Sequence, residues 1–141
     1  MKQGKIIVNK VYRKGKIDKR IYGSFVEHMG RVVYSGVYEP ENPCADEDGF
    51  RTDVLQAVKD AGITSIRYPG GNFVSCYHWE DGIGDKKLRP RRPELAWKAV
   101  ETNEFGTDEF MKWCKKAGTE PVLAVNLGTR GIEDAVHYLE Y

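Results

Sequence analysis

The sequence predicts an α/β fold, the N-terminal part of a (β/α)8 TIM barrel, because strand and helix patterns alternate along the chain. Two passages, residues 61–71 and 117–128, repeat one design, in which Ala-Gly precedes a strand and then a glycine-containing loop. The loops after the strands are long and rich in Gly, Asn, Trp and Tyr, whereas the helix-to-strand loops are short. This asymmetry is typical of barrels, whose functional residues lie on the loops after the strands. About three strand–helix units are present where a barrel has eight, so we expect a longer protein.

The first two predicted strands are expected to belong to different sheets. Residues 5–12 are β-prone but have no helix of their own, so we expect them to join another sheet. The next strand is predicted at residues 21–26, with Glu27 directly after it. Because α/β folds place their sites at the carboxyl ends of strands, Glu27 is a candidate functional residue, and an ordinary surface acid is the alternative. His28 points the opposite way if the pleat continues, as a satisfied histidine would.

Three amphipathic helices are expected from apolar residues at helical spacing. Thr52 is expected to cap the first helix, and Gly62 to end it. Thr107 is expected to cap the second, and Gly118 to end it. The third begins near Gly131.

Two further strands complete the pattern. Residues 121–127 form a nearly continuous apolar run, which predicts a strand buried on both faces, as in a parallel sheet. The strand at residues 65–68 ends at Pro69, which has no N–H for the ladder. Gly70 and Gly71 then allow a positive φ or a close approach of the backbone to a ligand.

Polar and aromatic side chains come after this glycine pair in one short loop. The segment is either a tight turn that packs on itself or a loop that presents these groups into a pocket. A phosphate-binding loop is disfavoured, because no G-x-G-x-x-G motif packs against a helix start here. The side chains in question are Asn72, Cys76, Tyr77, His78 and Trp79.

Composition argues against several classes of partner. The formal net charge of +1 favours neither nucleic acid nor a membrane surface. The sequence holds no run of about 18 apolar residues and no evident signal peptide. Three cysteines without metal-ligand spacing fit a reducing cytoplasm and predict no metal site. The acidic residues 46–48 and the basic cluster in residues 86–92 are interpreted as solvated surface.

Several short motifs are distinctive as a set. They lie at residues 21–30, 67–74, 77–79, 89–92, 95–97, 101–106 and 124–129. Together they resemble the start of the intracellular α-L-arabinofuranosidases of glycoside hydrolase family 51. The resemblance covers essentially the whole chain.

The resemblance implies a retaining hydrolase on a (β/α)8 barrel followed by a β-sandwich. Residues 1–16 would hold a strand of the sandwich and residues 17–141 a partial barrel that stops before strand four. The implied reaction releases terminal non-reducing α-L-arabinofuranosyl residues from arabinan, arabinoxylan or their oligosaccharides. The resemblance also implies a cytoplasmic homo-oligomer that needs no cofactor.

Three sugar contacts carry over from the resemblance. Glu27 matches a glutamate that accepts hydrogen bonds from arabinose hydroxyls, and Asn72 matches an asparagine that does the same. Trp97 matches a tryptophan on the leaving-group side. Supporting roles are implied for Arg67 below the site, for Cys76 and Trp79 at the pocket wall, and for Asn126 at the next strand end.

The catalytic carboxylates do not carry over. The family places its acid/base in an Asn-Glu dipeptide after barrel strand four and its nucleophile after strand seven, both expected beyond Tyr141. Asn103-Glu104 is such a dipeptide, but it precedes a helix, so we reject it as the acid/base. Retaining hydrolysis needs two carboxylates about 5–5.5 Å apart, so the isolated chain is expected to be inactive. A non-catalytic carbohydrate-binding fragment is the alternative.

Overall fold

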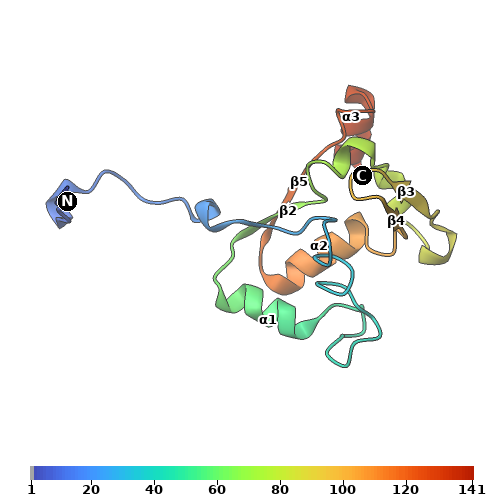
Figure 1. The fold of residues 1–141 in the computed structure, drawn as a ribbon, viewed down its shortest axis with the longest axis horizontal. Coiled ribbons are helices and arrows are strands. Elements are labelled where there is room, and N and C mark those ends of the chain that lie inside the picture. Colours follow the sequence, from blue (N-terminus) through green and yellow to red (C-terminus); the bar gives the residue numbers. More distant parts are fainter. Residues whose placement is uncertain (1) are drawn as a thin grey trace.

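A parallel sheet of three strands organises the fold, in the order β1 (Ser24–Phe25), β2 (Ser65–Tyr68), β5 (Glu120–Leu123) (Figure 1). In the computed structural model, which describes residues 2–141, both strand pairs are parallel. A helix comes after each strand: α1 (Thr52–Asp60), α2 (Thr107–Ala117) and α3 (Ile132–Glu140). The predicted α/β alternation of three strand–helix units is therefore confirmed.

The core lies between one face of the sheet and the helices α1 and α2. Side chains alternate along a strand, so Ile66 and Tyr68 of β2 point to the same face, where both are fully buried. Phe110 of α2 stacks on Tyr68, with ring centroids 4.4 Å apart. Leu55 of α1 and Trp113 of α2 join the same cluster. Figure 1 shows both helices together on this side of β2.

The opposite face of the sheet is open in the part of the chain that the structure describes. Phe25 and Val122 lie on either side of Arg67 in the register and are 63% and 46% exposed. The prediction of a doubly buried strand over residues 121–127 was wrong, since β5 ends at Leu123 and pairs with β2 alone among the described strands. One further N–H, that of Ala124, donates to the Tyr68 carbonyl at 2.8 Å, and the Asn126 carboxamide then turns the chain by accepting the N–H groups of residues 128 and 129.

The predicted helix ends are correct, but the predicted caps are not. Gly62 and Gly118 follow α1 and α2 with φ of +68° and +75°. Thr52 and Thr107 are instead the first helical residues. The Thr52 hydroxyl donates to a carbonyl in the preceding loop at 2.8 Å, and the Thr107 hydroxyl lies 3.0 Å from the Tyr138 hydroxyl of α3. Tertiary partners therefore take both hydroxyls away from the capping role.

The long segment between β2 and α2 contains an antiparallel hairpin that the sequence did not reveal. Its strands are β3 (Arg92–Glu94) and β4 (Ala99–Glu101). Single 3-10 turns at Val74–Cys76, Trp79–Gly82 and Lys86–Leu88 precede it. The hairpin lies beside the carboxyl end of the sheet, next to the loop after β2 (Figure 1).

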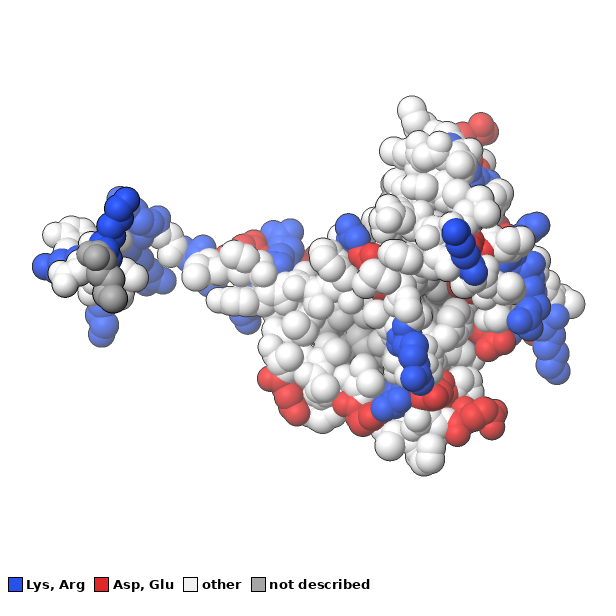
Figure 2. All heavy atoms as spheres, in the orientation of Figure 1, with Lys and Arg blue, Asp and Glu red and all other residues white. Residues whose placement is uncertain are grey.

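The described residues before β1 form an arm that extends away from the body (Figure 1), and Thr64 ties the base of this arm by donating to the carbonyls of Lys19 at 2.6 Å and Tyr22 at 3.3 Å. The strand predicted for residues 5–12 is absent there, and 3-10 turns occupy Lys10–Tyr12 and Lys19–Tyr22. Ile6 is 91% exposed, because no neighbouring strand in the described chain completes a ladder. The strand predicted at residues 21–26 is correspondingly limited to β1. Figure 2 shows Lys and Arg side chains along this arm.

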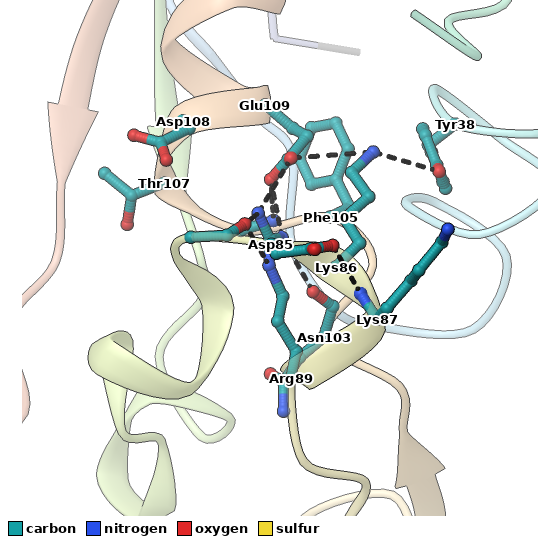
Figure 3. A network of polar contacts seen from close by, with 12 residues as sticks. Tyr38, Asp85, Lys86, Lys87, Arg89, Asn103, Phe105, Thr107, Asp108 and Glu109 are labelled. Carbon is teal, nitrogen blue, oxygen red and sulfur yellow. Dashed lines mark hydrogen bonds and ion pairs between the residues drawn. The ribbon is translucent and has the colours of Figure 1, made fainter.

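The two charged clusters are less solvated than expected. The Lys116 ammonium lies 2.7 Å from carboxylate oxygens of Asp46 and Asp48 and 3.0 Å from Glu47, which gives these acids a protein cation. Arg89 of the basic cluster is buried rather than solvated. Its guanidinium bonds the Glu109 carboxylate and two backbone carbonyls (Figure 3). No helix in the described chain has the length and apolar character needed to cross a membrane.

Candidate functional site

The carboxyl ends of β1 and β2 bring Glu27 beside the glycine pair. The ladder continues past β1, because the N–H of Val26 donates to the Arg67 carbonyl at 2.9 Å and that of His28 to the Pro69 carbonyl at 3.0 Å. Gly70 has φ of +136°, and a Cβ placed on it would lie 3.4 Å from the Glu27 carboxylate. The chain therefore passes close to Glu27 at a position that favours glycine.

Arg67 holds the Glu27 carboxylate from within the sheet. Its Nη2 donates to Glu27 Oε1, and its guanidinium lies over the Phe25 ring at 4.3 Å. The two charged side chains are only 37% and 18% exposed. A carboxylate held by an arginine is fixed in orientation, and its other lone pairs are able to accept hydrogen bonds from ligand hydroxyls.

Asn72 lies exposed at the tip of the loop that begins at Gly70. The next residue, Phe73, is buried and anchors the loop. A carboxamide both donates and accepts hydrogen bonds, so Asn72 is suited to a polyhydroxyl ligand. Glu27 and Asn72 thus extend from the ends of neighbouring strands.

His28 points away from Glu27, as the strand pleat predicted. Its Nδ1 lies 3.0 Å from Oε2 of Glu101 in β4, and its Nε2 lies 3.1 Å from the Tyr68 hydroxyl. Burial opposes ionisation of Glu101, but hydrogen bonds from His28 and Tyr34 outweigh it and lower the pKa of this carboxyl below its ordinary value. His28 is therefore a buried histidine with a partner on each ring nitrogen.

Trp97 lies at the turn of the hairpin and is 46% exposed. The Glu94 carboxylate fixes this turn by accepting the N–H groups of Ala96 at 2.7 Å and Trp97 at 2.6 Å. Trp97 lines a hollow of about 210 Å³ together with His28 and Phe73. An aromatic face at such a hollow is able to pack against a ligand ring.

The remaining candidates occupy three different surroundings. Cys76 is exposed and lines a second hollow, of about 170 Å³, between its loop and the hairpin. The ring of Trp79 stacks against Tyr138 of α3, with centroids 5.1 Å apart, so it packs on that helix. The Asn126 carboxamide donates to the Tyr77 carbonyl at 3.0 Å and so ties the loop after β5 to the loop after β2.

Two residues near the site were missed by sequence reasoning, namely Glu94 and Glu101. Both are buried carboxylates that organise the hairpin. Glu101 belongs to one of the distinctive motifs, which was the available signal. Its partner His28 is far away in the sequence, so the contact had no local signature.

Comparison with known proteins supports a common origin for this arrangement. Residues 57–139 match the sequence profile described as "Alpha-L-arabinofuranosidase 1 domain". The intracellular exo-α-(1→5)-L-arabinofuranosidase 1 of Bacillus subtilis is 60% identical over 141 residues, which are 100% of this chain and 28% of that protein. The corresponding Acetivibrio thermocellus protein is also 60% identical, with the same coverage.

Solved structures agree with the sequence matches. A family 51 α-L-arabinofuranosidase from Bifidobacterium longum has a TM-score of 0.86 and 62% identity, covering 87% of this chain and 24% of that one. The thermostable enzyme of Thermotoga petrophila has a TM-score of 0.86 and 55% identity, covering 89% and 26%. The chain thus spans less than a third of the relatives it matches.

The fold and the site define an α/β protein that carries polar ligand-binding groups at the carboxyl ends of parallel strands. The sequence and structural matches are more specific than this class. The chain belongs to the α-L-arabinofuranosidases of glycoside hydrolase family 51.

Proposed function

We propose that these residues form part of the substrate pocket of a retaining α-L-arabinofuranosidase that releases terminal non-reducing arabinofuranosyl residues. The observation that carries the proposal is the placement of Glu27 and Asn72 at the ends of adjacent parallel strands, in a chain 60% identical to an enzyme with this named activity. Arabinan and arabinoxylan oligosaccharides are the proposed substrates, and an α-1,5 linkage fits the names of the bacterial relatives.

Each proposed sugar contact has a distinct chemical role. Glu27, oriented by Arg67, accepts hydrogen bonds from arabinose hydroxyls. Asn72 donates to one hydroxyl and accepts from another. Trp97 packs against the group on the leaving side. Cys76 contributes to the wall near the loop, and Asn126 fixes that loop from behind.

The bond-breaking carboxylates are proposed to lie outside these 141 residues. In a retaining mechanism one carboxylate attacks the anomeric carbon while a second protonates the leaving oxygen, and water later hydrolyses the glycosyl-enzyme. Glu27 is assigned to binding because its carboxylate is already paired with Arg67. The residues described here would hold the arabinose ring in place during both steps.

The wider architecture is proposed on the same basis. Residues 17–141 would be the first part of a (β/α)8 barrel, whose remaining strands would cover the open face of the sheet at Phe25 and Val122. Residues 1–16 would add a strand to a β-sandwich after the barrel, which fits their β-prone sequence and the exposure of residues 2–16. We further propose a cytoplasmic homo-oligomer acting on oligosaccharides without a cofactor.

Hydrolysis of p-nitrophenyl α-L-arabinofuranoside by the complete protein tests this function. Wild type is expected to release nitrophenol, and Glu27→Ala and Asn72→Ala are each expected to lower kcat/KM by about 10²-fold or more, because hydroxyl contacts tighten in the transition state. Glu104→Ala, at an exposed acid that lines neither hollow, is the matched control. A wild-type protein that leaves this substrate intact would overturn the proposal.

A further inference from the structure

His28 contacts the two strand ends that carry the proposed arabinose ligands. It directly follows Glu27. Its backbone N–H donates to the Pro69 carbonyl and so fixes the chain immediately after Glu27 against the end of β2. Its ring stacks on Phe73, with centroids 4.2 Å apart and planes inclined by 14°. Phe73 is the residue after Asn72, so one imidazole lies next to both ligand-bearing positions.

The same imidazole reaches the hairpin that carries Trp97. Its Nδ1 lies 3.0 Å from Oε2 of Glu101, whose other oxygen accepts the Tyr34 hydroxyl and the N–H of Asn103. Glu101 is the last residue of β4, the strand that comes after the Trp97 turn.

The His28 ring lies on the opposite side of its strand from Glu27, at the wall of the hollow beside Trp97. It lines the 210 Å³ hollow together with Phe73 and Trp97. Hydrogen-bond partners at both ring nitrogens and a stacked face leave the ring a single orientation. An apolar side chain of similar size would fill the space but would hold neither Glu101 nor Tyr68.

We propose that His28 is a positioning residue that sets the relative placement of Glu27, Asn72 and Trp97, and thus aligns the arabinose side of the pocket with its leaving-group side. This inference rests on the proposed function of the site. A misplacement of about 1 Å among substrate-binding groups is enough to lower a rate by about 10²-fold, so such a residue affects catalysis without touching substrate.

Two variants of the complete enzyme separate positioning from packing. His28→Phe keeps the stack on Phe73 but loses both hydrogen bonds. His28→Asn is shorter, but its Nδ2 retains a donor where Nδ1 faces Glu101. Cys114→Ala, buried in the core on α2, is the control for lost stability. The substrates are p-nitrophenyl α-L-arabinofuranoside and α-1,5-L-arabinobiose, which differ in the group on the Trp97 side.

His28→Phe is expected to lower kcat/KM by about 10-fold on the aryl substrate, because Glu27 and Asn72 shift. The loss on the disaccharide is expected to be about 10²-fold, because the hairpin that carries Trp97 shifts as well. His28→Asn is expected to restore the disaccharide-to-aryl ratio of the wild type, since the hairpin stays tied to Glu101. Cys114→Ala is expected to lower Tm and leave both kcat/KM values unchanged at temperatures where it is folded.

Equal losses on both substrates in His28→Phe, or wild-type kinetics in both His28 variants, would overturn the positioning role while leaving the proposed function intact. Failure of the wild type on both substrates would overturn the proposed function and this inference with it. If His28→Phe does not fold, His28→Gln replaces it, because its amide takes the place of Nε2 beside Tyr68 and leaves Glu101 without its partner. A larger loss on the disaccharide than on the aryl substrate then supports the role, and equal losses or wild-type values refute it.

Discussion

The guanidinium of Arg89 lies inside the protein and forms a two-pronged ion pair with Glu109 at the start of α2 (Figure 3). Nη1 donates to Oε2 at 2.9 Å and Nη2 to Oε1 at 3.0 Å. The same two nitrogens also donate to the carbonyls of Asn103 and Gly84 at 2.9 and 2.8 Å. One side chain thus joins the loop before the hairpin, the segment after it and the first turn of α2.

Removal of this guanidinium is expected to be costly. Arg89→Met removes both guanidinium hydrogen bonds from the buried side of the Glu109 carboxylate, which keeps only the Gly106 N–H at 2.8 Å and the Lys86 ammonium at 3.5 Å. It also removes the donor to two carbonyls, so the free energy of unfolding should fall by about 3 kcal/mol. Urea denaturation followed by circular dichroism measures the change. Arg91→Met, at an exposed position of the same cluster, should change stability by about 0.5 kcal/mol or less. Equal effects of the two substitutions would contradict the buried role of Arg89.

The same pair makes stability depend on pH. Burial opposes ionisation of Glu109, but hydrogen bonds from Arg89 and from the N–H of Gly106 lower its pKa below the ordinary value of 4.5. The unfolded chain therefore binds a proton at a higher pH than the folded one. The stabilisation is fully present above about pH 4.5 and is lost as the pH falls through the lower folded pKa.

Glu109→Gln is accordingly expected to be less stable than wild type at neutral pH and to lose less stability on acidification. Urea midpoints measured between neutral pH and about pH 3 test this. Glu104→Gln, an exposed neighbour, is the control and should keep the wild-type pH dependence. A Glu109→Gln curve parallel to wild type over this range would refute the assignment.

Local patterns predicted the repeating elements well. The helical spacing of apolar residues and the glycines at 62 and 118 located α1 and α2, because these signals depend on neighbouring residues alone. The hairpin was missed because β3 and β4 are three residues each, and one reads Arg-Pro-Glu. Such strands exist through pairing and through the Glu94 carboxylate that fixes their turn.

For the candidate site, too, the sequence predicted the positions that follow strands but not the contacts between distant residues. Glu27 directly follows one strand pattern and Asn72 lies in the loop after the next, and parallel pairing brings the ends of those strands together. The contacts of Arg89 with Glu109 and of His28 with Glu101 join residues far apart in the sequence. In the sequence a buried arginine and a solvated one look alike, so the basic cluster was interpreted as uniform surface.

Gly70 offers a test of the close approach to Glu27. Its φ of +136° is a region that side chains rarely adopt, whereas an added Cβ would lie at an ordinary contact distance of 3.4 Å from the Glu27 carboxylate. Backbone strain, and not a clash, would therefore displace the chain beside Glu27. Gly70→Ala should cost about 1–3 kcal/mol of stability and weaken substrate binding in the complete enzyme, seen as a raised KM. Gly84→Ala, at φ of +72° with open space around its Cβ position, should lose stability alone. A raised KM in both variants would argue against a specific contact at Gly70.

The isolated 141-residue chain is expected to bind no sugar measurably and to cleave none. A pocket that offers Glu27, Asn72 and Trp97 from one side lacks most of the contacts of an enclosed site, and a retaining mechanism needs two further carboxylates about 5–5.5 Å apart. Titration calorimetry with L-arabinose should give no heat beyond dilution, and nitrophenol release should match that of the Glu27→Ala chain. Release above that control would mean that this chain contains its own catalytic carboxylates, and Glu27 would then have to be reassigned from binding to catalysis.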